Sequence, residues 1–122
     1  MEIKRIEHDF SICKVTDYSL VDFNREFIFT GRTDEENSLV CPTSEVPANA
    51  TERDDGWRAF RIQGILDFSL IGILSAISGI LAENQIGIFA ISTFHTDYIL
   101  VKAEQAQRAA EALARGGYHI TD

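Results

Sequence analysis

The sequence predicts an α+β fold in which two helices cover one face of an antiparallel sheet. Three observations in residues 56–122 lead to this prediction: short runs rich in β-branched or alternating residues, two segments with apolar residues at helical spacing, and turn residues between them. Together they give the order β-α-β-β-α-β. That order favours an antiparallel sheet with both helices on the same side.

The first two elements of this order are a strand and the helix that follows it in the sequence. Residues 57–62 alternate between apolar and polar types, which is typical of a half-buried strand. A helix is predicted from about Ser69 to Asn84, because leucine and isoleucine recur there every three or four positions. Gly72, Ala76 and Gly79 add a stripe of small residues to that helix. Each internal glycine costs a helix about 1 kcal/mol relative to alanine, so we expect close packing along the stripe.

A hairpin and a second helix follow. Residues 86–91 are rich in β-branched and aromatic types and predict a buried strand. The turn is expected at Phe94–Thr96, and residues 97–102 form the returning strand. A second amphipathic helix is predicted over 104–115, followed by a short last strand at 118–120.

The first half of the chain shows a weaker version of the same order. Short strands are predicted at three places: 10–15, 27–30 and 39–41. Residues 17–23 fit either a short helix or a turn. Asn49 to Gly56 is charged and has no periodicity, so we predict a loop and place the domain boundary between residues 55 and 56. A strong helix is missing here, so either this half is degenerate or its strands join the sheet of the second half.

Composition and charge exclude several classes of function. The chain has 122 residues, of which 45% are hydrophobic and 25% charged, as in ordinary globular domains. Its net charge of −8 argues against nucleic acid or an anionic membrane as a partner. The longest charge-free apolar run, Phe68 to Ala82, is too short to span a bilayer, which takes about 20 residues. Charged residues break any apolar run at the N-terminus, so we expect no secretory signal there. A cytoplasmic location is predicted from Cys13 and Cys41, which are expected to be reduced thiols.

Catalytic and metal-binding motifs are missing from the sequence. Cys13 and Cys41 form no C-x-x-C pair and have no histidine at metal-ligand spacing, so we expect two buried, reduced thiols and no metal. His8, His95 and His119 do not stand beside a nucleophile in a recognisable motif. We therefore predict a non-enzymatic protein that needs no cofactor.

Three segments of the second half resemble the ACT-domain family. They are Leu66–Leu74, Ile88–Thr93 and Thr96–Val101, in that order. The subgroup that they resemble most is that of small bacterial tandem-ACT proteins, whose repeats are similar to those of CASTOR-type arginine sensors. Val40-Cys41-Pro42 in the first half and Gly56-Trp57 at the start of the second half also fit this subgroup.

The resemblance implies a specific architecture and a class of ligand. It implies a ferredoxin-like βαββαβ fold in two tandem units, of which residues 1–55 form a degenerate unit and residues 56–122 a complete one. It also implies that such units associate side by side and bind small molecules, usually amino acids, at the interface between units.

A candidate ligand site can be argued from the chemistry of an amino acid. Its carboxylate would suit the free backbone N–H groups at a helix start, here 68–70. Its ammonium would suit a carboxylate, either Asp67 or Asp97, and the resemblance to arginine sensors supports Asp97 near the cationic end of a ligand. The predicted set, completed by strand residues that supply backbone and hydroxyl groups, is Asp67, Phe68, Ser69, Leu70, Ala90, Ile91, Ser92, Thr93 and Asp97.

Structural roles for the same residues stay open. Asp67 can cap the predicted helix, which would occupy the donors that a ligand carboxylate needs. If Ser69 caps the helix instead, Asp67 remains available to a ligand. Asp97 also suits a purely structural place at the end of a hairpin.

Three functions are therefore weighed. The first is an amino-acid-binding sensor, expected to be a homodimer, that acts on another protein. The alternative is a dimerisation or scaffold module with no ligand. The third, an RNA-binding module, is disfavoured by the acidic charge and by strand aromatics that do not form a base-stacking platform.

Overall fold

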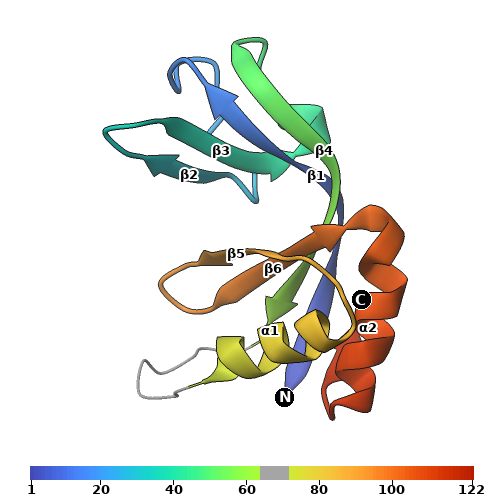
Figure 1. Cartoon of the computed structure of the whole chain (residues 1–122). Coiled ribbons are helices and arrows are strands. Elements are labelled where there is room, and N and C mark those ends of the chain that lie inside the picture. The colour runs from blue at the N-terminus through green and yellow to red at the C-terminus, as the bar shows by residue number, and fades with distance from the viewer. Residues whose placement is uncertain (64–71) are drawn as a thin grey trace. The chain divides into compact units, whose positions relative to one another are not determined.

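The computed structural model describes residues 1–63 and 72–122, and it divides into two compact units. The split unit consists of Met1–Glu7 and Arg58–Asp122, and the inserted unit consists of His8–Trp57. Two long strands, β1 (Glu2–Val15) and β4 (Ala50–Ile62), run from one unit into the other (Figure 1). Each of them therefore supplies a strand to both units.

The split unit has the predicted order of helices and strands. After β4 come α1 (Ile73–Glu83), β5 (Phe89–Ser92), β6 (Asp97–Lys102), the 3-10 turn η2 (Ala103–Gln105), α2 (Ala106–Arg115) and β7 (His119–Thr121). The strands lie in the order β7-β1-β4-β6-β5. The strands other than β1 lie in the ferredoxin-like order, β7-β4-β6-β5. The start of β1 is inserted between β7 and β4, which are the last and first strands of that motif.

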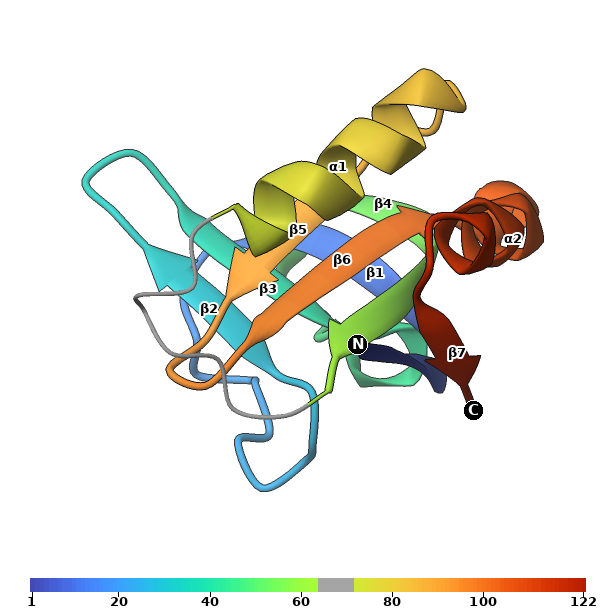
Figure 2. The ribbon, with the colours of Figure 1, turned by 90° about the horizontal axis from the view of Figure 1, so that it is seen from below.

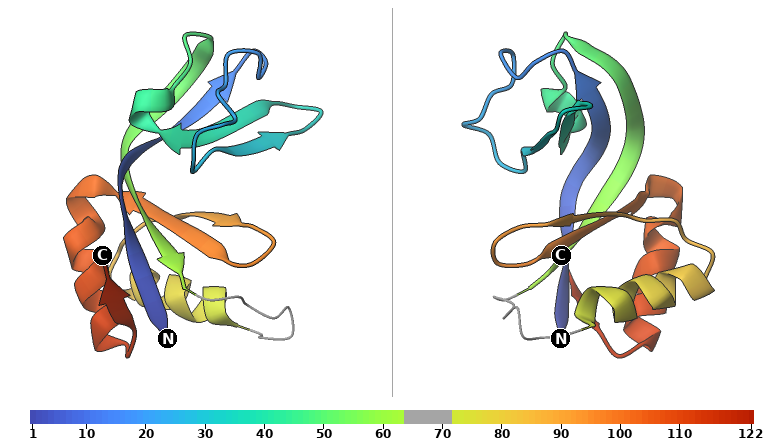
Figure 3. Two further views of the ribbon diagram at one scale, coloured as in Figure 1. Left: turned by 180° about the vertical axis from the view of Figure 1, so that it is seen from behind. Right: turned by 60° about the vertical axis from the view of Figure 1, so that its left-hand side comes forward.

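Both helices of the split unit pack on one face of its sheet. Phe60 and Ile62 on β4 and Ile99 and Val101 on β6 point to the same side and are at most 1% exposed. They form a core with apolar residues of α1 and α2, namely Ile77, Leu81, Ala109, Ala110 and Leu113. Figures 2 and 3 show both helices on the same side of the β5–β6 hairpin. The predicted α+β class, with two helices on an antiparallel sheet, is confirmed; the β1–β7 pair is parallel.

The inserted unit has the same strand order without the helices. Its strands are the second part of β1, then β2 (Phe29–Arg32), β3 (Asn37–Pro42) and the first part of β4, in the order β2-β3-β1-β4. Residues 8–57 are all described, and they contain no α-helix beside the 3-10 turn η1 (Thr43–Glu45). Loop side chains cover the core instead: Tyr18, Val21, Ile28 and Val46 pack against Cys13, Val15, Leu39 and Cys41.

The hairpins of the two units repeat each other at a constant offset. The strands β2 and β3 and the turn η1 correspond to β5, β6 and η2, each 60 residues later. The registers agree as well, since Phe29 pairs with Val40 and Phe89 pairs with Leu100. The same strand–turn–strand–turn element therefore occurs twice in the chain.

Two sequence predictions in the first half need correction. The predicted loop from Asn49 to Gly56 is wrong, because β4 begins at Ala50 and continues through it. The strand predicted at 10–15 begins at Glu2 instead. In both segments, pairing between distant parts of the chain produces a strand that the local pattern does not show. The predicted boundary at residues 55 and 56 falls within β4.

The structure also bears on two open or approximate predictions. Residues 17–23 form turns, and Asp17 accepts the backbone N–H of Ser19 at 3.0 Å. The helix expected from Ser69 has its described beginning at Ile73 and ends at Glu83. The segment 64–71 lies outside the described residues.

Candidate functional site

The predicted site residues fall into two groups. Four of them lie outside the described residues: Asp67, Phe68, Ser69 and Leu70. The other five are in the β5–β6 hairpin: Ala90, Ile91, Ser92, Thr93 and Asp97. The side chains of Ala90, Ser92 and Thr93 are exposed, whereas Ile91 and Asp97 are half-buried.

The end of this hairpin is a small polar cluster. Ser92 and Asp97 are paired across the two strands, and the Ser92 hydroxyl donates to Oδ1 of Asp97 at 2.5 Å. The Thr93 N–H donates to the Thr96 carbonyl at 2.8 Å and closes the turn. Among residues 1–63 and 72–122, Ser92 is the hydrogen-bond partner found for the Asp97 carboxylate, so Oδ2 keeps its capacity to accept a bond.

Thr96 attaches this hairpin to the end of β4. Its hydroxyl donates to the Ile62 carbonyl at 2.6 Å, one residue before the last described residue of that segment, Gln63. On the other face, Nη1 of Arg61 lies 3.3 Å from the Tyr98 hydroxyl, and the guanidinium lies 5.8 Å from the centre of the Tyr98 ring. The structure therefore brings Asp97 close to the point where the chain leaves β4 towards residues 64–71.

The ligand site predicted from the sequence did not include Thr96. The signal was the Thr93-x-x-Thr96 spacing, in which each end of a tight turn carries a hydroxyl group. The Thr93 hydroxyl donates to the Thr96 carbonyl at 3.0 Å, so the first threonine holds the turn while the second reaches β4.

The described start of α1 differs from both of the sequence alternatives. Gly72 holds the N-cap position that was assigned to Asp67 or Ser69, and its φ of 86° lies in the left-handed region that glycine adopts readily. Within the described residues no side chain caps this helix. The backbone N–H groups in its first turn belong to Ile73, Leu74 and Ser75, and a helix start of this kind favours anionic groups.

Both cysteines are buried free thiols. Burial raises the pKa of Cys41 from 9.0 to about 12, and the neighbouring Cys13 and Glu45 add to the increase. Burial also raises the pKa of Cys13. Both groups are therefore protonated at neutral pH and are poor nucleophiles.

The described segments lack two further features, a metal-binding cluster and a membrane-spanning helix. Residues 1–63 and 72–122 contain no group of three or more His, Cys, Asp or Glu side chains arranged to hold a metal ion. No helix in those segments has the length and apolar character needed to cross a membrane.

The strand order, the two helices and the polar hairpin end define a ferredoxin-like α+β protein. A family model described as "ACT domain" matches residues 52–115, which is more than half of the chain. The chain therefore belongs to the ACT-domain family, as the sequence resemblance predicted. No curated protein matches the chain.

Solved structures support the same assignment. A protein from Agobacterium tumefaciens is 30% identical, with a TM-score of 0.86 over 98% of this chain and 90% of that one. A Vibrio cholerae protein described as of unknown function and possibly a transport protein is 24% identical, with a TM-score of 0.76 over 92% and 86% of the two chains. The ligand-free regulatory subunit of aspartate kinase from Thermus thermophilus has the same fold at 11% identity, with a TM-score of 0.66 over 96% and 98%.

Proposed function

We propose that the protein is a non-enzymatic regulatory module that binds an amino acid and acts on another protein. The observation that carries this proposal is the polar end of the β5–β6 hairpin in a chain of the ACT-domain family. There a half-buried carboxylate, Asp97, lies close to the end of β4. The fold shared with the regulatory subunit of aspartate kinase from Thermus thermophilus agrees with a regulatory role.

The proposed ligand position lies next to Asp67, Phe68 and Ser69, which the sequence predicts to begin a helix, at the interface between ACT units. The ligand ammonium would be held by Asp97, which keeps one carboxylate oxygen available among the described residues. Backbone groups of β5 at Ala90–Thr93 would complete the site. β5 is the last strand of its sheet, so its outer edge has N–H and C=O groups that no described strand pairs.

We also propose two tandem units and a homodimer. The repeated hairpin, 60 residues apart, supports a duplication in which the first unit has lost its helices. The open edge of β5 would be covered by a second copy of the chain, because exposed edges favour pairing. Reduced buried thiols agree with a cytoplasmic location.

Thermal unfolding in the presence of each of the twenty amino acids tests the proposed ligand class. One of them should raise the stability saturably, by roughly 2.7 kcal/mol at about 100 times its dissociation constant. Titration calorimetry then gives that constant for wild-type protein and for Asp97→Ala, which should bind at least about tenfold more weakly.

The repeat supplies a matched control for this experiment. Asn37 occupies the position of Asp97 in the other hairpin, so Asn37→Ala should leave the dissociation constant within about twofold. No response to any amino acid at millimolar concentration would contradict the proposal and favour the scaffold alternative. Equal binding by Asp97→Ala and wild type would refute the role given to Asp97.

A further inference from the structure

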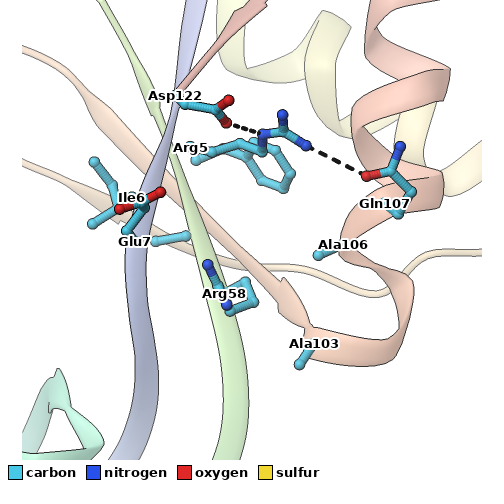
Figure 4. Close-up of a pocket in the computed structure, with 10 residues that line it drawn as sticks. Arg5, Ile6, Glu7, Arg58, Ala103, Ala106, Gln107 and Asp122 are labelled. Atoms are coloured by element: carbon cyan, nitrogen blue, oxygen red, sulfur yellow. Dashed lines mark hydrogen bonds and ion pairs between the residues drawn. The ribbon is translucent and has the colours of Figure 1, made fainter.

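A pocket of about 320 Å³ lies in the split unit, away from the β5–β6 hairpin end (Figure 4). It is bounded by β1, β4, the start of α2 and the residue after β7. Its polar lining residues are Arg5, Glu7, Arg58, Gln107 and Asp122. A pocket of this volume is at the lower end of the range seen for small-molecule sites.

Arg5 makes two accessible hydrogen bonds in this pocket. Its Nε donates to Oδ1 of Asp122 at 2.7 Å, and its Nη1 lies 3.4 Å from Oε1 of Gln107 (Figure 4). The Asp122 side chain is 69% exposed and that of Arg5 is 36% exposed, so water competes for the ion pair. An ion pair this accessible is easily opened. An incoming oxyanion can therefore replace the Asp122 carboxylate.

A second guanidinium lines the same pocket. Arg58 is on β4, two residues before Phe60, whose ring is 1% exposed and also lines the pocket. The lining therefore has two arginines and two carboxylates, Glu7 and Asp122, so it lacks the acidic excess of the whole chain, which has 19 acidic and 11 basic residues. Guanidinium groups bind carboxylate and phosphate through paired hydrogen bonds, and an apolar wall strengthens such bonds.

The start of a helix adds to the positive potential. Ala103, Ala106 and Gln107 line the pocket from η2 and the first turn of α2. In the described structure no side chain caps either helix start, at Lys102 or at Gln105. The Ala106 N–H donates to the Ala103 carbonyl, so the helix start favours an anion through its dipole.

The corresponding place in the inserted unit contains a hydrogen-bonded cluster of side chains. Ser11 stands two residues before the core residue Cys13 on β1, as Arg58 stands two residues before Phe60 on β4. Its hydroxyl, which is fully buried, lies 2.9 Å from the Thr43 hydroxyl and donates to Asp55 at 2.5 Å. Thr43 begins η1 as Ala103 begins η2. In the split unit the corresponding residues are Arg58 and Ala103, and both line the pocket.

We propose that this pocket binds a small molecule through a phosphate or carboxylate group. Arg5 and Arg58 hold the oxyanion, and the dipole of α2 favours it. In the free protein, Asp122 takes the place of the ligand anion on Arg5. The site is separate from the proposed amino-acid site and does not depend on it.

Titration with inorganic phosphate, and separately with malonate, tests this proposal by NMR of isotope-labelled protein at constant ionic strength. The Arg5 and Arg58 Nε–H signals and the Ala103 and Ala106 amide signals should shift saturably with at least one of the two anions. The anion that binds more tightly identifies the preferred group. If neither anion gives saturable shifts at tens of millimolar concentration, the proposal is overturned.

Variants then separate binding from folding. Arg58→Gln should weaken anion binding by at least about tenfold, and Asp122→Asn should tighten it, because the internal competitor is removed. Ala103→Asp places a carboxylate at the exposed mouth of the pocket and should block binding while the thermal unfolding temperature stays unchanged. Arg32→Gln makes the same charge change on the exposed strand β2 and should leave binding within about twofold.

Two results with these variants would overturn the proposal. Equal loss of binding in Arg32→Gln and Arg58→Gln would show a general charge effect and overturn the proposal. Wild-type affinity in folded Ala103→Asp would do the same. Because Asp97→Ala removes the proposed amino-acid site alone, it should still bind the anion with wild-type affinity.

Discussion

Replacing Cys41 with valine should remove a loss of stability that the wild-type protein shows above pH 9. The Cys41 side chain is fully buried on β3. Burial, with Cys13 and Glu45 nearby, raises the pKa of this thiol from 9.0 to about 12. In the unfolded chain the thiol ionises near its ordinary value. As the pH rises, the unfolded state therefore loses its proton first and becomes relatively more stable.

The size of the effect follows from the two pKa values. The contribution of Cys41 is fully present below pH 9 and is lost between pH 9 and about pH 12. At pH 10 the loss amounts to about 1.4 kcal/mol, since the pH is one unit above the pKa of the unfolded state. Cys13 contributes a loss of the same sign, and it is present in both proteins that are compared.

Urea unfolding of wild type and Cys41→Val at pH 7 and pH 10 measures this difference. Valine is the residue that the chain has at the equivalent position of the other hairpin, Val101, so the variant should fold. A hydrophobic change of similar volume costs less than about 1.5 kcal/mol at pH 7. The free energy of unfolding should then fall less in the variant than in wild type on going to pH 10. An equal fall in both proteins would refute the reasoning.

Three further outcomes are expected from urea unfolding. Ser11→Ala should destabilise the protein by about 1–2 kcal/mol, because the buried hydroxyl no longer donates to Asp55; an unchanged midpoint would contradict this. Gly116→Ala should cost about 1 kcal/mol, since its Cβ would lie 2.7 Å from Cδ1 of Ile80, and a simultaneous Ile80→Val should restore most of the loss. Phe94→Ser should change stability by less than about 0.5 kcal/mol, because Phe94 is 78% exposed at a turn; a larger loss would show that the ring is packed.

The sequence was a good guide to the second half of the chain because its signals are local. Apolar periodicity over the two helices, and the turn at Phe94–Thr96, each depend on neighbouring residues. The first part of β4 gave no such signal. Residues 51–55 are all exposed, and Gly56 has a φ of 83°, so the alternation of a half-buried strand is lost. Pairing with β1 defines this strand, and a local pattern does not contain that information.

The two candidate sites differ in the same way, because one depends on neighbouring residues and the other on distant parts of the chain. The hairpin residues around Asp97 were predicted because they lie within one continuous motif. The pocket at Arg5 and Arg58 was not predicted, since its residues come from β1, β4, α2 and the segment after β7. No spacing in the sequence relates Arg5 to Gln107, and the fold alone brings them within hydrogen-bond distance.

The division of β1 between two units has a consequence for synthesis. The inserted unit can form once residue 57 has left the ribosome, because all of its strands have then been made. The sheet of the split unit can be completed only after β7 has been synthesised, because His119 of β7 pairs with Glu2 in the parallel register. Contacts of such high sequence separation form slowly, and the strand at Glu2–Glu7 stays unpaired on that side until residues 119–121 have been made. Loss of a few residues from either end of this sequence therefore opens the same pair of strands, while the inserted unit keeps all of its own.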